Sequence, residues 1–222
     1  MGQWIELKPE GASPIRAWRA DPEGRPRGAI IVIQEIFGVN AHIRAVTDRF
    51  AIDDYLAIAP AIFERVEPGF DVGYDADARA RGIAIVNKLD REQVLRDVAA
   101  AIEVASEGGR VGTVGYCFGG TIAWLAASQL KGLSAAVCYY GGGILGLKDQ
   151  KPRVPTMLHF GEKDEHIPVA GVRELATQYP DIPVRLYLAG HGFNCDQRES
   201  YDAPSAALAW TRTLEFFRKH LG

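Results

Sequence analysis

Cysteine and methionine are scarce in this chain, with three and two residues among 222. Three cysteines cannot all pair, and the N-terminus lacks the basic start and apolar stretch of a secretory signal. We therefore expect free thiols in a cytoplasmic protein. Long apolar runs are missing too, since none approaches the roughly 18 residues that a membrane span needs. No association with a membrane is expected.

Excess charge of one sign is also lacking, because the net charge is only −3 at pH 7. This balance does not favour nucleic acid or an acidic membrane as a partner. No repeat, low-complexity tract or Pro/Gly/Ser-rich linker divides the sequence. With 47% hydrophobic residues, the chain is expected to form a single domain over residues 1–222. No heptad pattern or large apolar stripe indicates an obligate oligomer, so we expect a monomer.

Short apolar runs alternate with segments of helical periodicity. Two edge strands are predicted at Trp4–Leu7 and Ile15–Arg19. Further strands are predicted at Ala29–Gln34, Leu56–Ala59, Val111–Gly115, Leu133–Tyr139, Thr156–Phe160 and Val184–Leu188. Helices are predicted after the N-cap Asn40, twice within 75–107, over Gly119–Leu130, over 169–179 and at the C-terminus. This alternation predicts an α/β fold with a mostly parallel sheet covered by helices on both faces. Ligands of such sheets bind beyond the carboxyl ends of the strands.

A G-x-C-x-G turn around Cys117 joins a predicted strand to a predicted helix. This is the pattern of a nucleophile elbow, with cysteine where serine is commoner. The flanking small residues let strand and helix pack closely, and the helix N-terminus favours a thiolate. The backbone N–H of Phe118 would face a developing oxyanion. A small buried cysteine in a glycine-rich turn is the alternative interpretation.

A nucleophile elbow predicts an acid and then a histidine, in that chain order. Asp164 follows the strand that ends at Phe160, and His191 lies between two glycines after the strand that ends at Leu188. Glu162 and Glu165 are weaker candidates for the acid. His42, His159, His166 and His220 do not fit the role of the base. Each signal is weak alone, but three in the required order predict a Cys–His–Asp triad.

These residues resemble the dienelactone hydrolase (carboxymethylenebutenolidase) family of the α/β-hydrolases over nearly the whole chain. The most specific segments are Gln34-Glu35-Ile36-Phe37-Gly38, Gly115-Tyr116-Cys117-Phe118-Gly119-Gly120, Tyr139-Tyr140-Gly141, Gly161-Glu162-Lys163-Asp164 and Ala189-Gly190-His191-Gly192-Phe193. The resemblance implies an α/β-hydrolase fold and the catalytic triad Cys117, Asp164 and His191. It further implies that Ile36 N–H joins Phe118 N–H in an oxyanion hole. Glu35 matches the family glutamate that accepts a hydrogen bond from the resting thiol.

The pocket implied by the resemblance is less complete than the catalytic centre. Family arginines hold a substrate carboxylate, and alignment places Arg79 at one such position, with Arg81 as the near alternative. The second family arginine follows the histidine by four residues, where this chain has Cys195. Arg198, in the same loop, is a candidate replacement. Phe37 and Tyr140, within the matching segments, are further candidates for substrate contact. Two family aromatics become Ile83 and Val86.

The combined pattern predicts a cysteine-dependent hydrolase of small esters or lactones that works through a thioester intermediate. A thioesterase or acyltransferase with the same triad is an alternative, and so is a non-catalytic binding protein on this scaffold. A metal-dependent hydrolase using Cys117, Asp164, His191 and Cys195 is a weaker one, because H-E-x-x-H and paired C-x-x-C motifs are absent from the sequence. We therefore expect neither a metal nor a cofactor.

Overall fold

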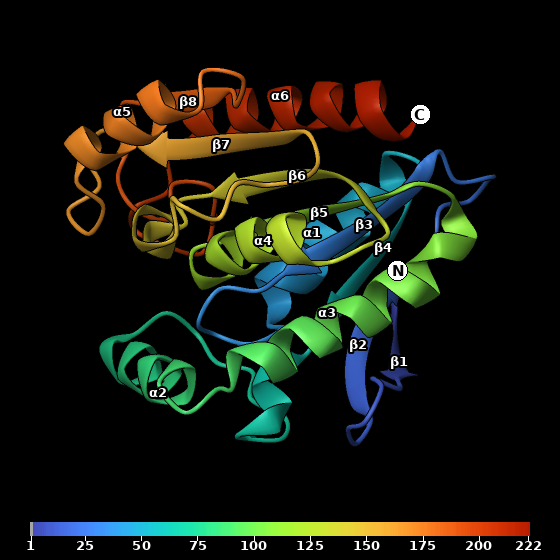
Figure 1. Ribbon diagram of the computed structural model, residues 1–222. Coiled ribbons are helices and arrows are strands. Elements are labelled where there is room, and N and C mark those ends of the chain that lie inside the picture. The colour runs from blue at the N-terminus through green and yellow to red at the C-terminus, as the bar shows by residue number, and fades with distance from the viewer. Residues whose placement is uncertain (1) are drawn as a thin grey trace.

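Eight strands form one sheet in the computed structural model, which describes residues 2–222 (Figure 1). The strands are β1 (Gln3–Leu7), β2 (Ile15–Ala20), β3 (Gly28–Ile33), β4 (Tyr55–Pro60), β5 (Val111–Tyr116), β6 (Leu133–Tyr139), β7 (Thr156–Gly161) and β8 (Val184–Tyr187). Their order is β1-β2-β4-β3-β5-β6-β7-β8. The strands β3 to β8 are parallel, and only β1 and β2 run antiparallel to their neighbours. The predicted mostly parallel α/β sheet is confirmed.

The second strand is not an edge strand, contrary to the expectation from its sequence. β2 pairs with β1 through Trp18 and Trp4, and with β4 through Ala17 and Pro60. Its mixture of buried and exposed side chains reflects a sheet face that is partly open to solvent. An alternating pattern of this kind reports the exposure of a face and does not show whether the strand has one neighbour or two.

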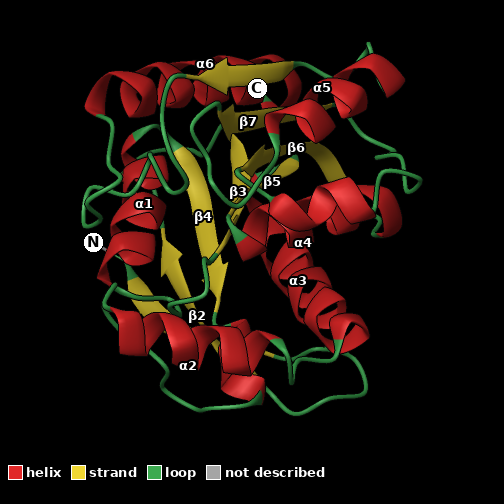
Figure 2. Cartoon of the chain, turned by 90° about the vertical axis from the view of Figure 1, so that its left-hand side faces the viewer, coloured by secondary structure: helices red, strands yellow, loops and turns green. Residues whose placement is uncertain are grey.

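Helices cover both faces of the sheet. They are α1 (Ala41–Ile52), α2 (Ala76–Val86), α3 (Arg91–Ala105), α4 (Phe118–Gln129), α5 (Val169–Gln178) and α6 (Ala203–Leu221), with short 3₁₀ turns at Ile62–Arg65, Ser106–Gly108 and Gly142–Gly146. In Figure 2, α1 and α6 lie against one face of the sheet, and α3, α4 and α5 lie against the other. Asn40 caps α1 as predicted, because its side-chain oxygen accepts a hydrogen bond from Ile43 N–H at 3.2 Å.

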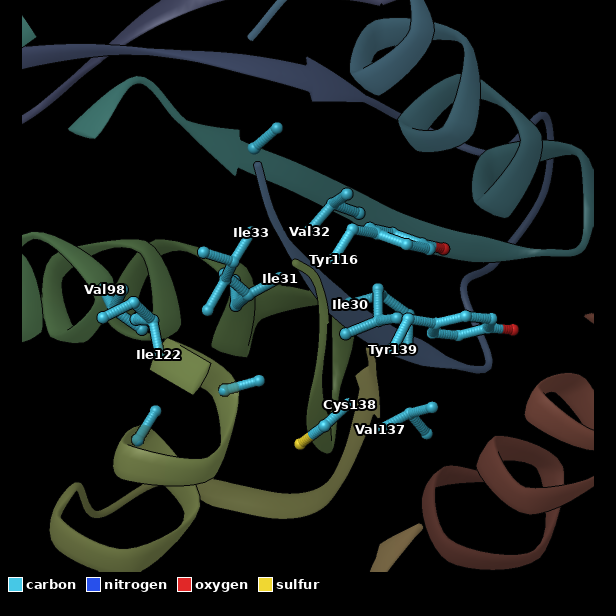
Figure 3. Packing of buried hydrophobic residues seen from close by; sticks show 14 of the residues in the cluster. Ile30, Ile31, Val32, Ile33, Val98, Tyr116, Ile122, Val137, Cys138 and Tyr139 are labelled. Atoms are coloured by element: carbon cyan, nitrogen blue, oxygen red, sulfur yellow. The ribbon is translucent and has the colours of Figure 1, made fainter. Parts of the chain in front are cut away.

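The central strand β3 is buried along its whole length. Figure 3 shows Ile31 and Ile33 directed toward Val98 of α3 and Ile122 of α4. Val32 points to the opposite side, as the two-residue period of a strand requires. A strand with helices on both faces needs apolar residues at every position, which explains its continuous apolar run. Within residues 2–222, no helix has both the length and the apolar character needed to cross a membrane.

Candidate active site

Cys117 lies at the carboxyl end of β5, in the tight turn that leads into α4. Its φ is 55° and its ψ is −114°, a backbone conformation that few non-glycine residues adopt. A side chain at Gly115 would place its Cβ 1.9 Å from the Gly119 carbonyl oxygen. Strand and helix therefore approach as closely as the predicted elbow requires, and the turn lifts the thiol above the edge of the sheet.

His191 connects the thiol to the carboxylate of Asp164. Its Nε2 lies 3.2 Å from Cys117 Sγ, and its Nδ1 lies 2.7 Å from Asp164 Oδ2. The other carboxylate oxygen of Asp164 accepts hydrogen bonds from the N–H groups of His166 at 2.8 Å and Ile167 at 3.2 Å. The three predicted triad residues thus come together from three loops at the carboxyl ends of β5, β7 and β8.

Protonated His191 is strongly favoured at this position. Burial works against the charged ring, but the hydrogen bonds and charges of Asp164 and Cys117 outweigh it and raise the pKa of His191 to about 10. The pKa of Asp164 is lowered, because its bonds to His191 and to backbone N–H groups overcome the effect of burial. The protonated ring therefore faces the sulfur of Cys117 on one side and the carboxylate of Asp164 on the other.

Two backbone N–H groups are available beside the thiol. Phe118 is the first residue of α4, so its N–H has no acceptor within the helix. Within residues 2–222, Ile36 N–H also has no hydrogen-bond acceptor. Both residues line the same cavity as Cys117. At Gly82 a Cβ would meet the Ile36 carbonyl oxygen at 2.0 Å, so this glycine lets α2 pack directly on the turn that carries Ile36.

Glu35 is buried at the carboxyl end of β3, with 1% of its surface exposed. Its Oε1 accepts a hydrogen bond from Arg198 Nη1 at 3.2 Å, and its Oε2 has no partner within residues 2–222. The thiol contact that the resemblance implied for Glu35 is not formed here, because Cys117 Sγ faces His191 instead. The guanidinium of Arg198 competes for the carboxylate as a charged donor, which is a stronger partner than a thiol.

A cavity of about 390 Å³ opens over Cys117 and His191. Its lining is apolar apart from a few side chains, and it contains no aspartate or glutamate. Three arginines and a second histidine contribute the other charged or titratable groups: Arg79, Arg91, Arg198 and His166. Neither Arg79 nor Arg91 has a carboxylate partner within residues 2–222. The arrangement is suited to an apolar ligand that carries negative charge.

The helix α2 presents one face to this cavity, through Arg79, Ile83 and Val86. These positions have the i, i+4, i+7 spacing of a single helix face. Arg81 is two residues from Arg79 and so points to the other side of the helix, where it pairs with Glu67 at 2.7 Å. The alternative placement of Arg81 in the substrate pocket is therefore wrong.

Of the two aromatic candidates, only Phe37 lines the cavity. Tyr140 is fully buried, and its ring centre lies 5.2 Å from that of His191. Its expected contact with substrate is therefore wrong, and its ring packs near that of His191 from inside the core. Because Tyr140 directly follows β6, the sequence gives no indication of which way its ring turns.

Sequence reasoning missed two residues of the pocket. His166 was set aside as a catalytic base, yet it lines the cavity, and its Nε2 lies 3.5 Å from Arg79 Nη2. Its position two residues after Asp164 is a signal that it shares the loop at the site. Arg91, the first residue of α3, carried no comparable signal. Arg198, the candidate replacement for the missing guanidinium, lines the cavity, and its contact with Glu35 emerges only from the structure.

The fold and this site define an α/β-hydrolase. A model of the dienelactone hydrolase family matches residues 15–221. The chain is 36% identical to the carboxymethylenebutenolidase of Pseudomonas putida, over 88% of this chain and 87% of that protein. A Synechocystis protein named "Putative carboxymethylenebutenolidase" is 37% identical over 86% of both chains.

Solved structures agree with the sequence relatives. A Klebsiella pneumoniae structure titled "Putative Dienelactone Hydrolase" is 30% identical and superimposes with a TM-score of 0.86, covering 99% of this chain and 100% of that one. The chain therefore belongs to the dienelactone hydrolase family. Membership confirms the resemblance read from the sequence, the α/β-hydrolase fold and the expected hydrolase class.

Proposed function

We propose that this protein hydrolyses small carboxylic esters or lactones, with Cys117 as its nucleophile, and that it does so as a cytoplasmic, single-domain monomer. The observation that carries the proposal is the position of His191, whose two ring nitrogens contact Cys117 Sγ at 3.2 Å and Asp164 Oδ2 at 2.7 Å. Nucleophile, base and orienting acid are then in hydrogen-bond reach of one another, which is the arrangement that nucleophilic catalysis needs.

Acylation begins with attack of the Cys117 thiolate on the ester carbonyl. The carbonyl oxygen becomes an oxyanion, which the N–H groups of Phe118 and Ile36 hold. Collapse of this intermediate forms a thioester and expels the alcohol or enolate oxygen, which takes a proton from the His191 imidazolium if it needs one. A lactone that expels an enolate suits this site, because a stable enolate can leave before it is protonated. The enolate, which stays tethered to the acyl group because the lactone is a ring, then takes the His191 proton and leaves His191 neutral for deacylation.

Deacylation uses the same residues. Neutral His191 takes a proton from a water molecule as the water attacks the thioester, and Asp164 holds the ring in the orientation that this requires. The second oxyanion collapses, the C–S bond breaks, and the carboxylic acid leaves with the thiolate and imidazolium restored. A thioesterase or acyltransferase would share these steps and differ in its acyl donor or acceptor. Measuring how much of the acyl group is transferred to water and how much to an added alcohol distinguishes hydrolysis from acyl transfer.

The pocket favours a substrate with a carboxylate. Arg79 lines the cavity with an exposed side chain and has no carboxylate partner within residues 2–222, so its guanidinium is available to a substrate carboxylate. Arg198 also lines the cavity, where it pairs with Glu35. Its guanidinium takes the place of the family arginine that this chain lacks at position 195, and it holds the Glu35 carboxylate at the same time. With Glu35 held in this way, Cys117 stays free to interact with His191.

The test is the hydrolysis of a chromogenic short-chain ester by the full chain, followed by acid quenching and peptide mass spectrometry. We expect an acyl adduct on Cys117, and complete loss of turnover and adduct in Cys117→Ala with the fold retained. Cys138→Ala is the matched control, because this thiol is buried in β6. Turnover that survives Cys117→Ala would refute the nucleophile. A folded wild-type chain that neither turns over esters or lactones nor reacts with a thiol reagent would indicate a binding protein.

A further inference from the structure

Three side chains with metal-binding atoms meet where α1 lies beside the loop between β8 and α6, and none of them belongs to the triad. We propose that His42, Cys195 and Asp196 form a binding site for Zn²⁺ or a similar transition-metal ion. One ligand atom from each residue lies within 4.8 Å of the other two. His42 Nδ1 and Asp196 Oδ1 are only 3.1 Å apart.

The three residues come from segments far apart in the sequence. His42 lies in the first turn of α1, whereas Cys195 and Asp196 lie in the loop that runs from His191 to α6. His42 and Cys195 are buried, with 4% and 0% of their surface exposed, and Asp196 is exposed. Burial of two of the three donors separates this group from the acidic clusters that are common on protein surfaces.

The ring of His42 presents its Nδ1 to Asp196, and this is the nitrogen that would bind the ion. Its Nε2 is directed to a different side of the ring, where it is buried without a hydrogen-bond partner within residues 2–222, and it takes no part in the site. A cavity of about 200 Å³ is lined in part by His42 and Asp196 but not by the buried Cys195, so an ion would reach the site from the side of His42 and Asp196.

The donors lie close to the spacing that a small transition-metal ion needs. Zinc binds nitrogen and oxygen at about 2.0–2.2 Å and thiolate sulfur at about 2.3 Å in tetrahedral geometry, so its ligand atoms lie roughly 3.3–3.8 Å from one another. The donor atoms here lie within 4.8 Å of one another, so the site must contract when an ion binds. The side chain of Asp196 is 66% exposed and has room for the small movement that closes the site. Arg49 lines the same cavity, but its guanidinium packs over the Trp210 ring at 3.8 Å.

The donor set also selects the class of metal. A thiolate and an imidazole favour Zn²⁺, Co²⁺ or a similar ion over Ca²⁺ and Mg²⁺, which prefer oxygen ligands. Burial raises the pKa of the Cys195 thiol to about 12, so the free site holds a protonated thiol. On binding, the S–H proton leaves to solvent as the S–metal bond forms. A water molecule from the cavity completes four-coordination.

An ion at this position would connect α1 to the loop that carries both His191 and Arg198. The site does not use Cys117, so it differs from a metal-dependent catalytic centre and does not depend on the proposed hydrolase mechanism. Because the metal binds the folded chain, it is expected to raise Tm as its concentration rises.

The test is a Co²⁺ titration of the full chain carrying Cys117→Ala, which removes the thiol that would compete at the active site. We expect one equivalent of Co²⁺ to produce a thiolate-to-cobalt charge-transfer absorption that Zn²⁺ displaces. Cys195→Ser should abolish this absorption, and Asp196→Asn should weaken binding by at least about tenfold. Two control variants should leave the absorption and the affinity unchanged. Cys138→Ser changes a buried thiol of β6, and Glu199→Gln changes an exposed acid in the loop that carries Cys195 and Asp196.

Two results would overturn the proposal: no stoichiometric binding of Co²⁺ or Zn²⁺, or a charge-transfer absorption that persists in Cys195→Ser. Circular dichroism and thermal melting establish that each variant is folded. If Cys195→Ser does not fold, Asp196→Asn decides the question, because Asp196 is exposed and its change leaves the core intact. Unchanged affinity in Asp196→Asn would then refute the site.

Discussion

Arg198 Nη1 lies 3.2 Å from Glu35 Oε1, in a contact that joins the loop after His191 to the end of β3. Only 1% of the Glu35 side chain and 20% of that of Arg198 are exposed. Nearby Glu35 raises the pKa of Arg198, although burial opposes the charge. The pair therefore fixes the position of the Glu35 carboxylate beside the cavity.

Replacing only one residue of the Glu35–Arg198 pair should destabilise the protein. Arg198→Gln leaves a buried carboxylate without its cation, and we expect the free energy of unfolding to fall by roughly 2–4 kcal/mol. Glu35→Gln with Arg198→Gln should recover part of that loss, because no unpaired charge is then left. Urea denaturation of the single and double variants measures the coupling. If the losses in free energy of unfolding of the two single variants add up to that of the double variant, the contact does not contribute to stability.

Removal of the acid from the triad should slow the reaction without preventing binding. Asp164→Asn keeps the size of the side chain but no longer stabilises the imidazolium, and it favours the wrong tautomer of His191. We expect kcat to fall by roughly 10³–10⁴-fold, with a small change in KM. Glu162→Gln, in the same loop, is the control and should remain close to wild type. An effect on KM alone would argue against the assigned role.

The high pKa of His191 predicts an alkaline limit to both stability and activity. The folded state binds this proton more tightly than the unfolded state, whose histidine pKa is about 6.5. The resulting stabilisation is complete below pH about 6.5 and is lost as pH rises through the folded value of about 10. We expect kcat/KM for esters to fall through the same alkaline range as the imidazolium is lost.

The variant Asp164→Asn checks this assignment, because it removes one of the groups that raise the pKa of His191. The alkaline limit should then move to lower pH in a stopped-flow acylation profile. A limit that stays in place would assign it to a different group.

The two arginines of α2 should differ in their effect on charged substrates. Arg79→Ala should lower kcat/KM for a carboxylated lactone by about 2–5-fold, since Arg79 is exposed and an ion pair open to solvent contributes roughly 0.2–1 kcal/mol. A neutral ester of similar size should be affected much less. Arg81→Ala, on the opposite side of the helix, should act on neither substrate. Equal losses on the charged and neutral substrates would contradict the role of Arg79 as an anchor.

Much of the catalytic centre could be predicted from local sequence, because local chemistry dictates it. A continuous apolar run such as β3 suits only a strand buried on both faces, and close strand–helix packing needs the small residues around Cys117. The parallel sheet then brings the loops after β5, β7 and β8 to one edge. This is why the chain order of Cys117, Asp164 and His191 was enough to predict their contact.

Side-chain direction and distant contacts were decided by the tertiary structure. Arg79 and Arg81 are close to equivalent in sequence, but the packing of α2 turns one into the pocket and the other toward Glu67. Tyr140 is buried because the core closes over it, which its neighbours in sequence do not specify.

The Glu35–Arg198 and His42–Asp196 contacts join segments more than 150 residues apart. Residue type and spacing therefore determined that Cys117, His191 and Asp164 would lie together at one edge of the sheet. Only the folded chain determined the shape and charge of the surrounding pocket, because helix rotation and loop packing depend on contacts that no local pattern encodes.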